Sequence, residues 1–139
     1  MRIFRILLIG GLLGFGLMLA GCKKDNLSVK YADGSGNLYV IISQPRPHLS
    51  YRPVSPALSS SGIYHGGEPV ERNLEPTQIQ ALRVRLEAAL KNQNVHIQHR
   101  VKMSGALEVY SDEQTFSVIL SPGCAEQVAL EKLLQTLKQ

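Results

Sequence analysis

Residues 95–120 read VHIQHRVKMSGALEVYSDEQTFSVIL, and this stretch decides the fold class that the sequence predicts. Apolar and polar residues alternate from Val95 to Met103, as in a half-buried strand. Two further apolar runs follow at 107–110 and 115–120, each after a short turn sequence. Because short connections favour antiparallel neighbours, residues 95–120 are expected to form a three-stranded meander.

Helical patterns flank this meander on both sides. Pro76 suits the first turn of a helix, where its missing N–H costs nothing. Apolar residues then recur at helical spacing, at Ile79, Leu82, Leu86, Ala89 and Leu90. A second helix is expected after Ser121 as N-cap and Pro122 as first residue, with an apolar stripe of Leu130, Leu133, Leu134 and Leu137.

The run NLYVIIS at 37–43 is rich in β-branched residues and predicts a first strand. The order is therefore strand, long loop, helix, three strands and helix. We expect one α+β domain over residues 37–139, in two layers, with a mostly antiparallel sheet of about four strands and two helices on one face.

The N-terminal segment has the pattern of an export signal. Arg2 and Arg5 begin an apolar run that ends in Leu19-Ala20-Gly21-Cys22. A basic start, a short apolar core and small closing residues are typical of a secretory signal peptide, here residues 1–21. An uncleaved anchor helix is the alternative, since the run is near the lower length limit for spanning a bilayer.

The four closing residues resemble the lipobox of bacterial lipoproteins. This resemblance implies cleavage between Gly21 and Cys22, and a diacylglyceryl group with an added acyl chain such as palmitate on Cys22. Acyl chains of this kind would anchor the protein stably to the lipid bilayer. Lys23 stands where the inner-membrane retention signal of enterobacterial lipoproteins has Asp, which implies the outer membrane, with the domain facing the periplasm.

Residues 22–36 are polar, charged and glycine-containing, and we expect a flexible tether there. Without the two arginines of the signal, 13 of the 15 basic residues remain, two more than the 11 acidic ones. A net positive charge this small does not indicate a nucleic-acid-binding surface, so no nucleic-acid partner is predicted.

Cys124 is the second of two cysteines, so no internal disulfide is expected. It falls in the first turn of the predicted last helix, where a lowered thiol pKa could make a nucleophile, although a packed residue or an intermolecular disulfide are open alternatives. His96 and His99 would point to opposite faces of a strand and cannot share a ligand. The sequence predicts no metal site and no cofactor beyond the lipid on Cys22.

Residues 44–67 contain four prolines, several serines and three glycines, and predict a long loop that is either functional or disordered. Tyrosine on a small polar loop offers contact area at low entropic cost. Ser-Gly followed by tyrosine resembles, over a few residues, the loop that some bacterial envelope lysozyme inhibitors insert into a cleft. The candidate partner-binding residues are Tyr51, Ser60, Ser61, Gly62, Ile63, Tyr64 and His65.

These features predict a non-catalytic protein-binding module of the cell envelope, either an accessory subunit of a complex or an inhibitor or immunity protein. No familiar catalytic motif is present. The alternatives are a thiol-dependent envelope enzyme that uses Cys124, and a structural lipoprotein that joins membrane to peptidoglycan.

Overall fold

A computed structural model describes residues 26–112 and 114–139. The predicted signal peptide at 1–21 and the predicted lipidation site at Cys22 lie outside these residues. None of the helices in the two described ranges has the length and apolar character needed to cross a bilayer.

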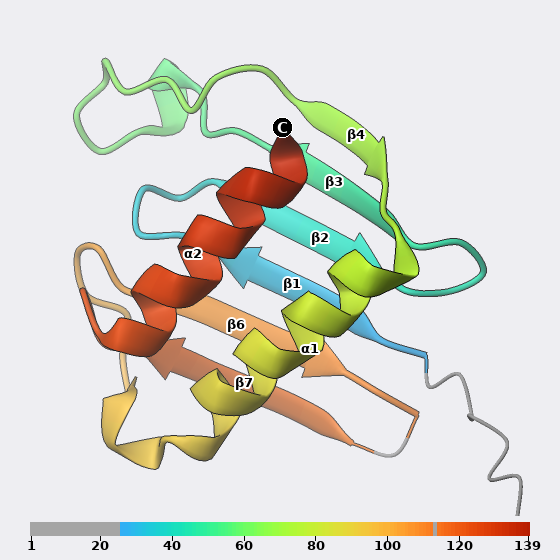
Figure 1. Cartoon of the computed structure of the whole chain (residues 1–139). Coiled ribbons are helices and arrows are strands. Elements are labelled where there is room, and N and C mark those ends of the chain that lie inside the picture. Colours follow the sequence, from blue (N-terminus) through green and yellow to red (C-terminus); the bar gives the residue numbers. More distant parts are fainter. Residues whose placement is uncertain (1–25, 113) are drawn as a thin grey trace, which may run out of the picture.

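In the described residues, one antiparallel sheet of seven strands carries both α-helices on the same face, as Figure 1 shows for their arrangement. The strands are β1 (Ser28–Ala32), β2 (Leu38–Ile42), β3 (His48–Arg52), β4 (Val70–Asn73), β5 (His96–Ile97), β6 (Gly105–Tyr110) and β7 (Thr115–Leu120). The helices are α1 (Pro76–Lys91) and α2 (Ala125–Lys138), with short 3-10 turns η1 (Pro56–Leu58) and η2 (Gln93–Val95). The α+β class is confirmed. The expected number of four strands is wrong.

The predicted tether at 22–36 is wrong from residue 28 onward, because β1 lies in the middle of the sheet between β2 and β6. Val29 and Tyr31 point to the helices and are buried, whereas Ser28, Lys30 and Ala32 face the uncovered side. Half of the strand is therefore polar or small, and this composition resembles that of a linker.

The predicted loop at 44–67 contains β3, whose Leu49 and Tyr51 are buried. Prolines at 45, 47 and 53 lie outside the five strand residues, so their missing N–H groups remove no hydrogen bond between the strands. The assignment of Tyr51 to a partner-binding loop is wrong, because its side chain belongs to the core.

The predicted meander is also wrong in part. β6 and β7 form a hairpin, but β5 spans only two residues and pairs with the far side of β7 at the edge of the sheet. Val101 and Met103 are exposed, and Met103 has a positive φ of 66°, so the alternation beyond Ile97 does not form a strand. His99 is likewise exposed.

α1 begins at Pro76 as predicted, behind a capping box between Glu75 and Gln78. α2 begins three residues later than predicted. Its N-cap is Cys124, whose sulfur accepts a hydrogen bond from the Gln127 N–H at 3.4 Å. The expectation that Ser121 caps this helix is wrong.

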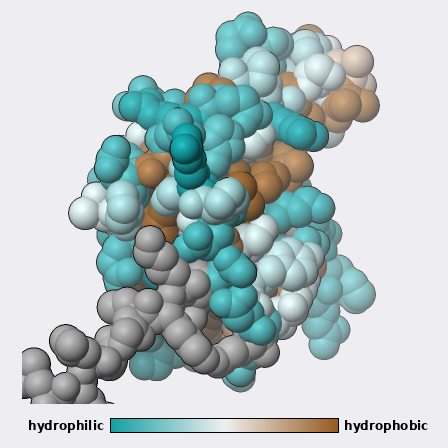
Figure 2. Space-filling view, turned by 90° about the vertical axis from the view of Figure 1, so that its right-hand side faces the viewer, coloured by the Kyte–Doolittle hydropathy of each residue, from teal (hydrophilic) through white to brown (hydrophobic). Residues whose placement is uncertain are grey.

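The sheet has two ends, which we name by where the chain enters. The proximal end holds Asn26, the β2–β3 turn and the β6–β7 turn, and Figure 2 looks onto it. The distal end holds the β1–β2 turn and the segment that follows β3. β1 runs from the proximal to the distal end.

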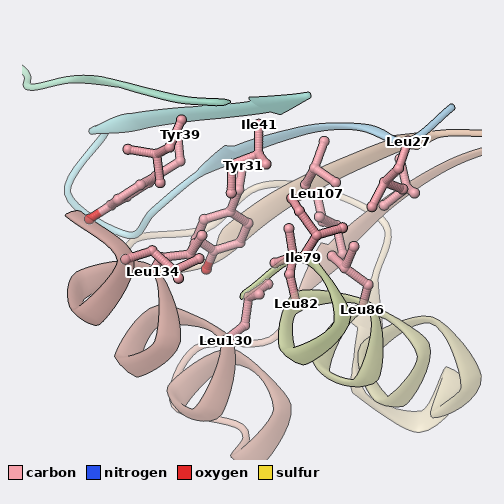
Figure 3. Packing of buried hydrophobic residues seen from close by; sticks show 14 of the residues in the cluster. Leu27, Tyr31, Tyr39, Ile41, Ile79, Leu82, Leu86, Leu107, Leu130 and Leu134 are labelled. Atoms are coloured by element: carbon pink, nitrogen blue, oxygen red, sulfur yellow. The ribbon is translucent and has the colours of Figure 1, made fainter. Parts of the chain in front are cut away.

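The core fills the space between the sheet and the two helices, as Figure 3 shows. Buried leucines of α1 and α2 meet side chains from the central strands. Three tyrosines extend across this layer: the rings of Tyr39 and Tyr51 are 4.8 Å apart, and those of Tyr31 and Tyr39 are 6.5 Å apart. Among the described residues, no helix covers the opposite face of the sheet, so the core is one layer of side chains between the sheet and the helices.

Candidate functional site

Three loops from separate parts of the chain meet at the distal end of the sheet. They are the β1–β2 turn at 33–37, the segment 53–67 after β3, and the segment 98–104 before β6; we call them together the distal rim. Figure 1 shows all three along the left side of the molecule. The β1–β2 turn and the segment 53–67 each connect neighbouring antiparallel strands, and the segment 98–104 leads into β6, which pairs with β1.

The middle loop of the rim is a closely hydrogen-bonded turn. The Asp33 carboxylate accepts bonds from the Ser35 and Asn37 backbone N–H groups, both at 2.9 Å, and from Asn37 Nδ2 at 2.8 Å. Both Asp33 and Asn37 are buried. A buried polar pair whose partners are all present holds one conformation, so this turn is a rigid base for its neighbours.

Asn37 links this turn to the segment 53–67. Its Oδ1 accepts a hydrogen bond from the Val54 N–H at 3.0 Å, and its Nδ2 donates to the Tyr64 hydroxyl at 3.0 Å. The Tyr51 hydroxyl donates to the Gly66 carbonyl at 2.6 Å. A side chain at Gly66 would overlap Asn37, which explains the glycine. The segment is therefore fastened at both of its ends.

Asp33 links the turn to the segment 98–104. Arg100 Nη2 donates to the Asp33 carbonyl at 3.1 Å and to the Ser104 carbonyl at 2.9 Å. The backbone of Met103 packs against Gly34, where an added Cβ would lie 2.7 Å from the Met103 carbonyl oxygen. Gln127 on α2 donates to that same carbonyl at 2.9 Å. The third loop is thus held from two sides.

The rim presents apolar side chains to solvent. Ile63 is 83% exposed and Leu58 is 79% exposed, and Val101 and Met103 are exposed on the neighbouring loop. Scattered exposed apolar residues are common on proteins. Here, four such residues lie on loops that hydrogen bonds hold in place.

Basic residues accompany this apolar surface. Arg52, Arg100 and Lys102 are exposed on the rim or beside it, and the Asp33 carboxylate is turned inward. Lys138 Nζ lies 4.1 Å from the centre of the Tyr51 ring. Burial raises the pKa of Tyr51 to about 12, so its hydroxyl stays a hydrogen-bond donor to Gly66 at neutral pH.

Of the residues predicted from the sequence, Ser60, Ser61, Gly62, Ile63, Tyr64 and His65 all lie exposed in the segment 53–67. Ser61 Oγ accepts from the Tyr64 N–H at 3.2 Å, and His65 Nδ1 accepts from the Gly67 N–H at 3.0 Å. Sequence reasoning missed Leu58, Val101 and Met103 as surface residues and Asp33 and Asn37 as their support. The Asp-Gly-Ser-Gly-Asn turn was the available signal for the last two.

Two groups elsewhere have reactive side chains. Cys124 Sγ caps α2, and no hydrogen bond of the described residues joins it to a histidine. On the uncovered sheet face, His48 Nε2 lies 2.6 Å from Glu71 Oε2 and Ser50 Oγ donates to Glu71 Oε1 at 2.6 Å. The serine faces the carboxylate and not the imidazole, so this group is no serine–histidine pair.

Throughout residues 26–112 and 114–139, no three His, Cys, Asp or Glu side chains lie where they could hold a metal ion together. Comparison with known proteins finds no family of sequences that matches this chain. No curated protein matches it either.

Proposed function

We propose that the chain is a membrane-anchored lipoprotein of the outer membrane whose periplasmic domain binds another envelope protein without catalysing a reaction. The lipobox resemblance at Leu19-Ala20-Gly21-Cys22 supports the anchor. The distal rim supports the binding role. The acyl chains on Cys22 are the only covalent addition that the proposal includes.

The single observation that carries the binding role is the support given to exposed apolar residues. Leu58 and Ile63 project from a segment fastened by Asn37 and Tyr51. Ordering a loop before it binds removes part of the entropic cost of association. The chemistry of the rim fits a partner with an apolar patch and acidic surroundings, because Arg52, Arg100 and Lys102 accompany the apolar residues.

Photo-crosslinking in cells tests this proposal on the full chain. A benzophenone amino acid replaces Ile63 in one variant and Met103 in another. Val84, an apolar residue of α1 that is 56% exposed, provides the matched control position. We expect one adduct of the same mass from positions 63 and 103, and none of that mass from position 84.

Equal crosslinking at all three positions would contradict a specific rim, and no adduct at 63 or 103 would contradict the binding role. The structural alternative, a link between membrane and peptidoglycan, stays a prediction. Its test is sedimentation of the protein with purified peptidoglycan.

A further inference from the structure

The described residues begin directly at the proximal end of the sheet. The Asn26 N–H donates to Asp112 Oδ2 at 3.0 Å, in the β6–β7 turn. Leu27 is buried, and its N–H donates to Ser43 Oγ at 2.8 Å while its carbonyl accepts from the Ser43 N–H at 2.9 Å. The entry of the chain is thus fixed to two turns of the domain.

This entry point limits how far the domain can lie from the bilayer. The argument rests on the proposed lipidation of Cys22. Four residue steps separate Cys22 from Asn26, and a fully extended chain covers at most about 14 Å in that distance. β1 alone adds roughly 13 Å between the proximal and the distal end. The proximal end must therefore stay close to the headgroups.

The surface at this end is suited to a membrane interface. Ile42 and Tyr110 lie directly on either side of Ser28 in the sheet register, and they are 37% and 44% exposed. Together with Leu27 and Pro45 they line a shallow hollow. Tyrosine is enriched at the level of the headgroups, where its ring is apolar and its hydroxyl is wet.

A basic residue lies beside this surface, since Arg46 is exposed in the β2–β3 turn next to Pro45. In the sequence, Lys23, Lys24 and Asp25 lie in the four steps that join the lipid to the domain. Basic side chains near an anionic leaflet are attracted to its headgroups.

We propose that the proximal end of the sheet rests on the phospholipid headgroups, with Ile42, Pro45 and Tyr110 at the interface and Arg46 near the phosphates. The acyl chains supply the binding energy, and this surface sets the orientation. The distal rim then points away from the bilayer into the periplasm. The geometry separates a lipid-facing end from a partner-facing end on one small sheet.

The chain contains no tryptophan, which permits a clean fluorescence test. Tyr110→Trp places one probe at the proximal end and Tyr64→Trp places a matched one on the distal rim. Ile42→Trp is a second proximal probe in case Tyr110→Trp disturbs the fold. Each full-length lipidated variant is reconstituted into vesicles of phosphatidylethanolamine and phosphatidylglycerol, with and without bromine on the upper acyl chains.

We expect brominated lipid to lower the fluorescence of Tyr110→Trp and Ile42→Trp by about twofold or more, because their rings lie at the headgroup boundary. Tyr64→Trp should change little. Similar quenching of proximal and distal probes, or stronger quenching of Tyr64→Trp, would overturn the orientation.

Flotation separates this inference from the proposal on which it rests. Protein with Cys22→Ala cannot receive the lipid and should not float with vesicles. If the unmodified sequence also fails to float, the anchor is wrong and the orientation falls with it. If it floats while the proximal probes stay unquenched, only the orientation is overturned.

Discussion

The side-chain amide of Asn37 donates a hydrogen bond to the Tyr64 hydroxyl at 3.0 Å, across 27 residues of sequence. This contact joins the β1–β2 turn, in the middle of the distal end of the sheet, to the exposed segment that we propose as a binding surface. Asn37 is buried and also bonds to Asp33 and Val54. The shape of the rim therefore depends on a residue that no partner would touch.

Asn37→Ala should loosen the segment 53–67 and lower stability. The change leaves the Val54 N–H and one Asp33 oxygen without their partner, which costs about 1–3 kcal/mol. Urea unfolding measures the loss, and faster hydrogen exchange at Val54 and Gly66 locates it. Tyr64→Phe removes one hydrogen bond only and should cost about 0.5–1.5 kcal/mol. Equally small losses of stability in Asn37→Ala and Tyr64→Phe would contradict the role of Asn37 as the link between the turn and the segment 53–67.

Gly34→Ala should displace the segment 98–104. The new methyl group would lie 2.7 Å from the Met103 carbonyl oxygen, closer than atoms in contact allow. Overpacking of this kind costs about 1–3 kcal/mol, measurable by thermal unfolding. Ser35→Ala, at the exposed neighbouring position, provides the control and should change stability by less than about 0.5 kcal/mol. A fully stable Gly34→Ala protein would show that the two loops are not in close contact.

Tyr31→Phe should destabilise the protein far more than Tyr110→Phe, although each loses one hydrogen bond to a glutamate. The buried Tyr31 donates its hydroxyl hydrogen to the half-buried Glu131 at 2.7 Å, whereas the Tyr110 hydroxyl donates to Glu108 at the surface. We expect a loss of about 1–3 kcal/mol for the buried pair and less than about 0.5 kcal/mol for the exposed one. Similar losses in chemical denaturation would contradict the burial of Tyr31.

The pair of His48 and Glu71 should make stability depend on pH. Hydrogen bonding to Glu71 raises the pKa of His48, and bonds from Ser50 and His48 lower the pKa of Glu71. A raised histidine pKa means that the folded state binds the proton more tightly. The contribution of His48 to the free energy of unfolding is therefore complete below the ordinary histidine pKa of about 6.5. It disappears as the pH rises through the raised pKa of His48. In strong acid, as the pH falls through the lowered pKa of Glu71, this carboxylate takes up a proton and its contribution to stability is lost.

NMR titration of His48 checks this sign directly. Between pH 5.5 and 8, the unfolding midpoint of His48→Gln should change less with pH than that of the unchanged protein. The difference should be small, because the pair is exposed. A measured His48 pKa at or below about 6.5 would contradict the contact with Glu71.

Cys124→Ser should leave both stability and partner binding intact. The Cys124 sulfur is the N-cap of α2, and serine is a preferred residue at that position. Cys124→Val removes the cap and should cost about 0.5–2 kcal/mol in urea unfolding. Loss of crosslinking from position 63 in Cys124→Ser would instead support the thiol-dependent alternative.

Periodicity identified the elements whose apolar residues recur at regular spacing. The spacing from Ile79 to Leu90 predicted α1, and the run at 115–120 predicted β7, because these patterns stand out from their neighbours. β1 and β3 escaped detection because only two of five residues in each are buried and apolar. Such strands are recognisable only when the strands beside them are known.

Of the three loops of the distal rim, the sequence predicted only the segment 53–67 as an exposed surface. Ile63 and Tyr64 follow a serine- and glycine-rich run, and this composition pointed to an exposed segment. The alternation predicts Val101 and Met103 on the buried face of a strand, since an exposed loop and a half-buried strand can share one alternating pattern. Nothing local distinguishes the two, because the backbone of Met103 packs against Gly34, far earlier in the chain.

The sequence by itself determined the α+β class, the span of α1 and the hairpin of β6 and β7, since each follows from local spacing and turn residues. Tertiary structure alone decided the order of the seven strands, the central place of β1 and the gathering of three loops at the distal end. The physical reason is that pairing between strands far apart in the chain depends on which faces can be buried together, and no short stretch encodes that choice.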